Sequence, residues 1–228
     1  MESIVLDGTS KNKIYRELRR AIIMGHRKAG ERLDIDLLCH QYDTSITPVR
    51  DALQMLSQEG LITIRPRSGY FVTRISLKEL RDMLEMREIL ELAVLERAAA
   101  RITPDQLAAL RHVHAGYTGD DDESYDRYTD ENRRFHYLLA QASGNHELAE
   151  TLGHLHDRLA RYMVMRHAGQ TQEDGHQKIL DALQDKDLSA ARTHLLSEIR
   201  TSREAILERV YQEEAANWLL EAALPSQR

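Results

Sequence analysis

Hydrophobic residues in the first part of the chain recur three and four positions apart. This spacing is typical of amphipathic helices, and it predicts one helix around residues 14–23 and a shorter one around residues 33–38. A third helix is predicted over Val49–Leu56. Gly60 follows it, at the position where a helix end favours left-handed backbone. The first part of the chain therefore reads as three short helices.

The pattern then changes twice. Residues 61–65 and 70–73 are β-prone and flank the turn Pro66-Arg67-Ser68-Gly69, which predicts a β-hairpin. From about Ser76 onward strand signals stop and long helical patterns follow. Thr103 and Pro104 predict a helix start, with Thr as the N-cap and Pro at the first helical position. The expected helices cover residues 77–101, a segment from 104, and residues 125–143, 147–167, 175–184 and 188–212, with an acidic loop at 119–122 and a break within 169–175.

Charge is distributed unevenly along the chain. The whole protein has a net charge of −6, but residues 1–75 hold 12 Lys and Arg against 9 Asp and Glu, a net of +3, and the remainder has a net of −9. Such asymmetry favours nucleic-acid contact by the basic part. The single cysteine, Cys39, excludes an intrachain disulfide. No apolar stretch approaches the roughly 20 residues needed to span a bilayer and no secretion signal is seen, so we expect a cytoplasmic protein without membrane contact.

The segment 36–53 has the form of a helix-turn-helix, in which two short amphipathic helices flank a tight turn. The N-terminus of its second helix presents free N–H groups, and Ser45 and Thr47 add hydroxyl groups there. Arg50, one turn further on, can bind a guanine edge with two hydrogen bonds or contact a phosphate. Arg65 and Arg67 lie in the hairpin, in the place of a wing. We therefore predict DNA binding, with a winged helix used for protein contact as the alternative.

These residues carry a resemblance to the GntR family of regulators. The matching pieces span residues 14–73 and include Gly30-Glu31-Arg32-Leu33, Thr47-Pro48-Val49-Arg50-Asp51-Ala52-Leu53 and Arg67-Ser68-Gly69-Tyr70-Phe71-Val72. Two positions depart from the family pattern, since Ile46 replaces a usual Arg and Asp43 replaces a usual Gly in the turn. The resemblance implies DNA contact by Arg32, Ser45, Ile46, Thr47, Arg50, Arg65, Arg67, Ser68 and Gly69.

The second half of the chain resembles the FadR-type subfamily, whose all-helical second domain is called FCD. The matching pieces include Met86-Arg87, Leu90-Glu91, Asn132, Phe135-His136, Gly144-Asn145, His176, Ile179-Leu180 and Asp187. The fold class expected is mainly α, with an N-terminal winged helix-turn-helix carrying a small β-hairpin wing and a C-terminal all-α helical bundle. The expected domains are a DNA-binding domain over residues 8–74, an FCD-like effector- and metal-binding domain over 77–214, and a tail over 215–228, either a docked terminal helix or a frayed end.

The FCD resemblance implies a divalent metal inside the bundle, held by an Asp and three His. Asn132 stands at the Asp position, one helical turn before His136, and His176 matches a ligand histidine. Glu198 stands 22 residues further on, where the last His is expected, and His194 is the reserve. Mixed nitrogen and oxygen donors suit zinc, nickel or manganese. The alternative is that these are satisfied polar groups in a bundle core, or that the metal has been lost.

The resemblance also implies a small carboxylate effector. Arg87 is the candidate for binding it, because a guanidinium matches two carboxylate oxygens. The alternative for Arg87 is an intrahelical pair with Glu91, four residues on, and Arg158 is a second, weaker candidate for the effector.

Together these features predict a sequence-specific transcription regulator and not an enzyme. We expect a homodimer on a palindromic operator, since two related helix-turn-helix units match such a site, and repression under the control of an organic-acid or sugar-acid effector. The two alternatives are a metal-dependent enzyme, for which no Gly-x-Ser-x-Gly, His-Glu-x-x-His or phosphate-binding loop is present, and an architectural DNA binder without a ligand.

Overall fold

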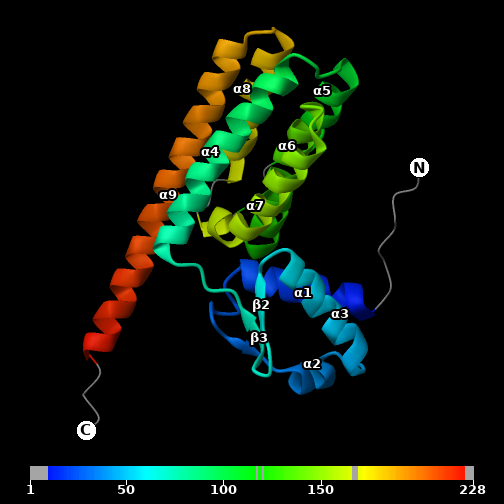
Figure 1. Cartoon of the computed structure of the whole chain (residues 1–228). Coiled ribbons are helices and arrows are strands. Elements are labelled where there is room, and N and C mark those ends of the chain that lie inside the picture. Colours follow the sequence, from blue (N-terminus) through cyan, green and yellow to red (C-terminus); the bar gives the residue numbers. More distant parts are fainter. Residues whose placement is uncertain (1–9, 117, 120, 166–168, 224–228) are drawn as a thin grey trace.

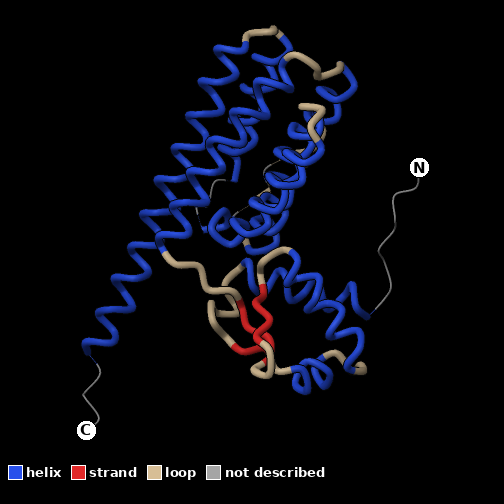
Figure 2. The backbone as a smooth tube through the Cα atoms, in the orientation of Figure 1, coloured by secondary structure: helices blue, strands red, loops and turns tan. Residues whose placement is uncertain are grey.

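The computed structural model describes residues 10–223 except 117, 120 and 166–168, and the side chains of 169 and 214–223 are not described. A small unit of helices and a three-stranded sheet lies against one end of an elongated helical bundle (Figure 1). Figure 2 shows that the described strands are confined to the small unit. Its elements are α1 Ser10–Ile23, β1 Arg32–Leu33, α2 Ile35–Gln41, α3 Ile46–Gln58, β2 Ile62–Arg65 and β3 Gly69–Val72.

The bundle contains the rest of the described chain. Its helices are α4 Leu77–Ala99, α5 Pro104–Arg111, α6 Asp122–Ala142, α7 His146–Met165, α8 Gly169–Gln184 and α9 Leu188–Ala223. The predicted mainly α fold with a β wing is confirmed. Among the described residues, no helix combines the length and apolarity that crossing a lipid bilayer requires.

Local signals fix several element ends as predicted. Thr103 caps α5 through a reciprocal pair of hydrogen bonds with Gln106, and Pro104 is the first helical residue. Gly60 (φ 75°) ends α3 in the left-handed region, and Asp43 (φ 46°) adopts the same region in the turn between α2 and α3. Asp tolerates this conformation better than most residues, so the departure from Gly keeps the turn intact.

Three element predictions were wrong. Leu33 does not lie in a helix but in strand β1, which pairs with β3 through Arg32–Phe71 and Leu33–Tyr70. The sheet therefore has three antiparallel strands in the order β1-β3-β2. The expected break within 169–175 is part of α8, and α9 extends beyond residue 212 to Ala223, so the backbone of 215–223 is a continuation of α9. Residues 224–228 of the predicted tail lie outside the described residues.

The two units share apolar and ionic contacts. Tyr125 and Tyr128 of α6 pack, together with Ala160 and Val164 of α7, into the hydrophobic core of the small unit. Arg19 of α1 donates to Glu59 at 3.1 Å and across the junction to Asp130 of α6 at 2.9 Å. Helix α6 is therefore in contact with the small unit along its first half.

Candidate DNA interface and buried polar cluster

The N-terminal end of α3 is exposed. Ser45, Ile46, Thr47 and Arg50 are all exposed, whereas Val49 is fully buried beneath them. The N-cap residues of α2, α4, α5 and α6 each accept a backbone N–H, but the side chain of Ser45 makes no capping hydrogen bond. The first N–H groups of α3 therefore have no side-chain cap from Ser45, which leaves this helix end suited to an anion or a base edge.

The wing brings further cationic groups to the surface. Arg65 and Arg67 are exposed, and Arg67 occupies the left-handed region (φ 63°) in the turn before Gly69 (φ 108°). The Arg65 guanidinium lies over the Phe71 ring at 4.6 Å from its centroid, which orients it. Arg32, exposed on β1, has its Nε 3.7 Å from the position that a Cβ of Gly69 would take. Strand β1, which the sequence did not predict, thus places Arg32 beside the wing turn.

A second set of polar side chains is buried inside the bundle. We call it the His/Glu cluster, and it includes members from five helices and from the segment after α5. Its residues are Arg87 and Glu91 of α4; His114 of the segment after α5; Glu131, Asn132 and His136 of α6; His156 of α7; His176 of α8; and Glu198 and Ser202 of α9.

Within this cluster, His136, His176 and Glu198 lie as metal ligands would. His136 Nε2 is 3.8 Å from one carboxylate oxygen of Glu198, and His176 Nε2 is 3.6 Å from the other. Ligands about 2.0–2.2 Å from one tetrahedral ion lie roughly 3.3–3.6 Å apart, so these separations are close to those of a metal site. The buried Nε2 of His136 has no hydrogen-bond partner among the described residues. Asn132 is buried one turn before His136 on α6.

The remaining ring nitrogens of both imidazoles have partners that hold the rings in place. His136 Nδ1 is 2.9 Å from Glu91, and His176 Nδ1 is 2.8 Å from Nε2 of His114. His114 in turn contacts Glu131 at 3.2 Å. Partners of this kind fix the tautomer and direct the other nitrogen to a metal. His176 is also stacked on Phe135, with ring centroids 3.7 Å apart.

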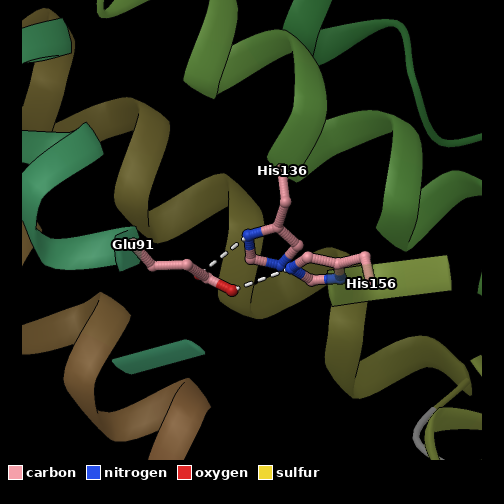
Figure 3. A group of neighbouring side chains, drawn as sticks. All are labelled: Glu91, His136 and His156. Carbon is pink, nitrogen blue, oxygen red and sulfur yellow. Dashed lines mark hydrogen bonds and ion pairs between the residues drawn. The ribbon is translucent and has the colours of Figure 1, made fainter. Parts of the chain in front are cut away.

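A second group of three, Glu91, His136 and His156, is held together by one hydrogen bond and one ion pair and is not open. Figure 3 shows these side chains pointing toward one another from α4, α6 and α7. One carboxylate oxygen of Glu91 forms an ion pair with His136 Nδ1 at 2.9 Å, and the other forms a hydrogen bond with His156 Nε2 at 3.0 Å. We therefore assign Glu91 to orienting His136, and not to a second metal.

Electrostatics couple these groups. Burial lowers the pKa of His136, but the carboxylates of Glu91 and Glu198 outweigh this and raise it above its usual value. Burial lowers the pKa of His156 to about 4, so this ring is neutral at pH 7. Burial raises the pKa of Glu198, but His136, His176 and Arg87 outweigh it and hold the pKa far below its usual range. Arg87 with its two partners Glu91 and Glu198 carries a net charge of −1, which favours a proton on His136 or a bound cation.

Arg87 is fully buried at the centre of the His/Glu cluster. It donates to Glu91 at 2.7 Å, to Glu198 at 3.1 Å and to the Ser202 hydroxyl at 3.1 Å. The intrahelical pair with Glu91, which the sequence left as the alternative, is present in the structure. The effector role of Arg87 remains a prediction, and it requires a ligand to replace one of these partners.

Two other predicted residues lie apart from the His/Glu cluster. Arg158 packs at the junction of the two units, where a Cβ at Gly60 would lie 2.9 Å from its Cγ. His194 is partly buried and belongs to neither group of three converging ligands among the described residues. The sequence analysis missed His114 and His156 and treated Glu91 only as a partner of Arg87. His156 has one signal, its position on α7 between the buried Leu152 and Leu159.

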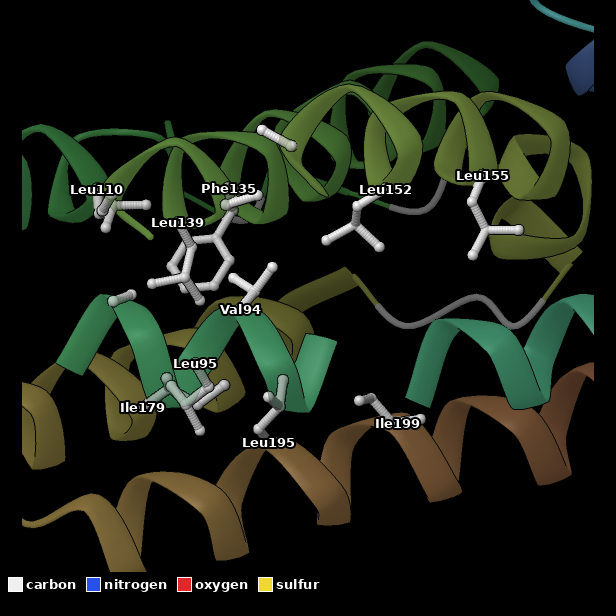
Figure 4. Close-up of a cluster of buried hydrophobic side chains, with 14 of the residues drawn as sticks. Val94, Leu95, Leu110, Phe135, Leu139, Leu152, Leu155, Ile179, Leu195 and Ile199 are labelled. Atoms are coloured by element: carbon white, nitrogen blue, oxygen red, sulfur yellow. The ribbon is translucent and has the colours of Figure 1, made fainter. Parts of the chain in front are cut away.

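The apolar core of the bundle contacts the His/Glu cluster, since Phe135 is stacked on His176 and the Met163 sulfur lies 3.8 Å from Nη1 of Arg87. Figure 4 shows buried residues from α4 through α9 meeting in one layer, among them Val94, Leu139, Leu152 and Ile199. The exclusion of water strengthens each electrostatic interaction inside, and it makes any unmatched charge costly.

A winged helix with an exposed recognition helix, joined to a helical bundle with a buried polar centre, defines a transcription regulator that binds DNA. The family comparisons agree. Residues 10–72 match the model of bacterial regulatory proteins of the gntR family, and residues 82–201 match the FCD domain. The chain belongs to the GntR family and carries an FCD domain.

Full-length relatives support this assignment. The chain is 30% identical over 215 residues to the HTH-type transcriptional repressor RspR of Escherichia coli strain K12, covering 92% of this chain and 93% of that protein. It is 27% identical over 209 residues to the HTH-type transcriptional repressor GlaR of the same strain, covering 84% and 95%. The solved structure of E. coli McbR/YncC matches with a TM-score of 0.65 at 24% identity, covering 90% of this chain and 99% of that one. The structure of McbR/YncC supports the fold, and RspR and GlaR, like the gntR family itself, are transcriptional regulators and not enzymes, as expected for this chain.

Proposed function

We propose that this protein is a metal-dependent repressor whose affinity for a palindromic operator is controlled by a small organic acid or sugar acid. The observation that carries the sensing role is the convergence of His136, His176 and Glu198 on one buried point. A bundle that needed only stability would gain little from burying so many ionisable groups, because their desolvation offsets most of their attraction.

The residues that fit a metal are His136 and His176 through Nε2 and Glu198 through its carboxylate, with Asn132 as the fourth candidate. A bound divalent ion would supply positive charge for an acidic ligand. Mixed nitrogen and oxygen donors suit zinc, nickel or manganese. Arg87 borders the same point. We assign it to binding the effector's carboxylate when Glu198 binds the metal instead of Arg87.

Metal content tests this assignment directly. We expect roughly one transition-metal ion per chain by elemental analysis after loading. H136A and H176A should lower this to near zero, whereas H194A, which removes a histidine on α9 one turn from Glu198, should leave it unchanged. No metal in loaded protein that still binds an effector, or equal content in all variants, would exclude the site.

DNA contact is assigned to the N-terminal end of α3 and to the wing, through the same nine residues that the sequence predicted. Support comes from the exposure of eight of them, Gly69 being half-buried, and from the uncapped helix end. In a gel-shift assay with fragments of the neighbouring promoter at low salt, we expect a retarded band that an effector weakens.

A thermal-shift screen of organic and sugar acids identifies that effector. A sensor gives a hit that alters DNA affinity, and an architectural protein gives none.

A homodimer held by the bundle would place two recognition helices on one operator. Its support is an apolar strip on α4, where Ile89 is 60% and Met86 38% exposed. Ile89 also lines a groove of about 520 Å³ with Leu92 and Leu207. I89R should convert a dimer to a monomer in light scattering, and an unchanged mass would place the dimer contact elsewhere.

A further inference from the structure

One apolar side chain stands among the polar groups at the exposed end of α3. Ile46 is the first residue of the helix and is 45% exposed, between exposed Ser45 and Thr47. It is not among the side chains that pack against the hydrophobic core of the small unit. An isoleucine here leaves apolar surface in water at the position where a recognition helix meets base edges.

The chemistry of Ile46 restricts what it can recognise. It has no hydrogen-bonding group, so it cannot distinguish the donors and acceptors of the base edges. The one apolar group that the major groove displays is the C5-methyl of thymine. Because a β-branched side chain is stiff about χ1, Ile46 holds its methyl groups in place before it meets a partner.

We propose that Ile46 recognises the C5-methyl group of a pyrimidine in the major groove, so that each operator half-site has a thymine facing the first turn of α3. This inference rests on the proposed DNA binding. Arg50, one turn further along the exposed end, supplies hydrogen bonds to a neighbouring base or phosphate, and Ile46 adds selectivity that charge cannot give.

The test separates the methyl group from the rest of the base. Operators are first selected from random DNA with the full chain, and each pyrimidine near the centre of a half-site is then replaced in turn. Thymine and 5-methylcytosine carry the methyl group, whereas uracil and cytosine lack it. At one position per half-site we expect thymine to bind better than uracil, and 5-methylcytosine better than cytosine. Both factors should be about fourfold, the effect of burying one methyl group.

Variants assign the effect to the residue. I46A should bind thymine and uracil operators equally. L37A is the matched control, since it removes another exposed apolar side chain, 72% exposed on α2, and should keep the fourfold ratio. Equal binding of methylated and unmethylated bases at every position, or a ratio that survives in I46A, would overturn the inference. A selection that enriches no sequence would overturn the proposed DNA binding as well.

Discussion

Arginine side chains lie in opposite environments in the two functional regions of this chain. At the end of α3 and in the wing, Arg50 and Arg67 are exposed. In the bundle, Arg87 is fully buried and bonded to Glu91 and Glu198. Exposed cations retain their hydration until an anionic partner arrives, whereas Arg87 has already exchanged water for carboxylates. The first region is therefore suited to binding a large anion from outside, and the second to binding a small ligand that rearranges internal pairs.

Removal of Arg87 should give the largest effect. In chelator-treated protein, R87A leaves Glu91 and Glu198 buried without their shared cation, which costs roughly 3–5 kcal/mol of unfolding free energy. Urea denaturation at pH 7 measures this. R97A removes an exposed arginine from the same helix and should change stability by less than about 0.5 kcal/mol. A loss below about 1 kcal/mol in R87A would mean that the buried carboxylates find other partners.

Removal of Arg50 should lower DNA affinity and leave the unfolding free energy unchanged, unlike removal of Arg87, which lowers the unfolding free energy. R50A should lower operator affinity by about tenfold to a hundredfold, since a bidentate base contact contributes roughly 1–3 kcal/mol. Its unfolding free energy should stay within about 0.5 kcal/mol of the parent, because the side chain is exposed. Fluorescence anisotropy at fixed salt measures the affinity, and R97A again serves as the control. Equal affinity in R50A and the parent would move the recognition surface away from this turn.

The two regions also differ in how far the sequence predicts them. The end of α3 is local: Pro48 in the first turn, Asp43 in the preceding turn and Gly60 after the helix all follow from neighbours in the chain. The strand Arg32–Leu33 could not be predicted, because two residues become a strand only by pairing with β3, nearly forty positions away.

The His/Glu cluster was predictable in part. Family spacing predicted His136, His176 and Glu198. The partners that orient the two rings come together only in the folded chain, Glu91 of α4 beside His136 of α6, and His114 after α5 beside His176 of α8. The break expected to end at Gly175 is absent, since Gly175 lies within α8, where an added Cβ would make an ordinary van der Waals contact of 3.7 Å with Cγ of Glu198.

Acidic pH should weaken metal binding and spare the DNA-binding surface. The pKa of His136 is raised by Glu91 and Glu198, so a proton occupies this ring up to a higher pH than usual and competes with the metal. Metal affinity should fall by about tenfold per pH unit below that pKa and level off above it. Competition with a zinc-sensitive dye between pH 5.5 and 8 measures this. A pH-independent affinity in the parent would show that His136 is not a ligand.

The smallest expected effect lies where the two regions meet. Arg19 of α1 contacts Asp130 of α6, whose side chain is 57% exposed, so their coupling should be only about 0.2–1 kcal/mol and should decrease with added salt. A double-mutant cycle of R19M and D130N, followed by urea denaturation, isolates this coupling from the bond between Arg19 and Glu59. Asp130 and Asn132 both belong to α6, so this helix carries residues of the His/Glu cluster as well as a contact with the recognition unit. A ligand in the bundle can change the position of the recognition unit only if it binds one arrangement of the two units more tightly than the other. A coupling above about 2 kcal/mol would contradict the small value expected for an exposed ion pair.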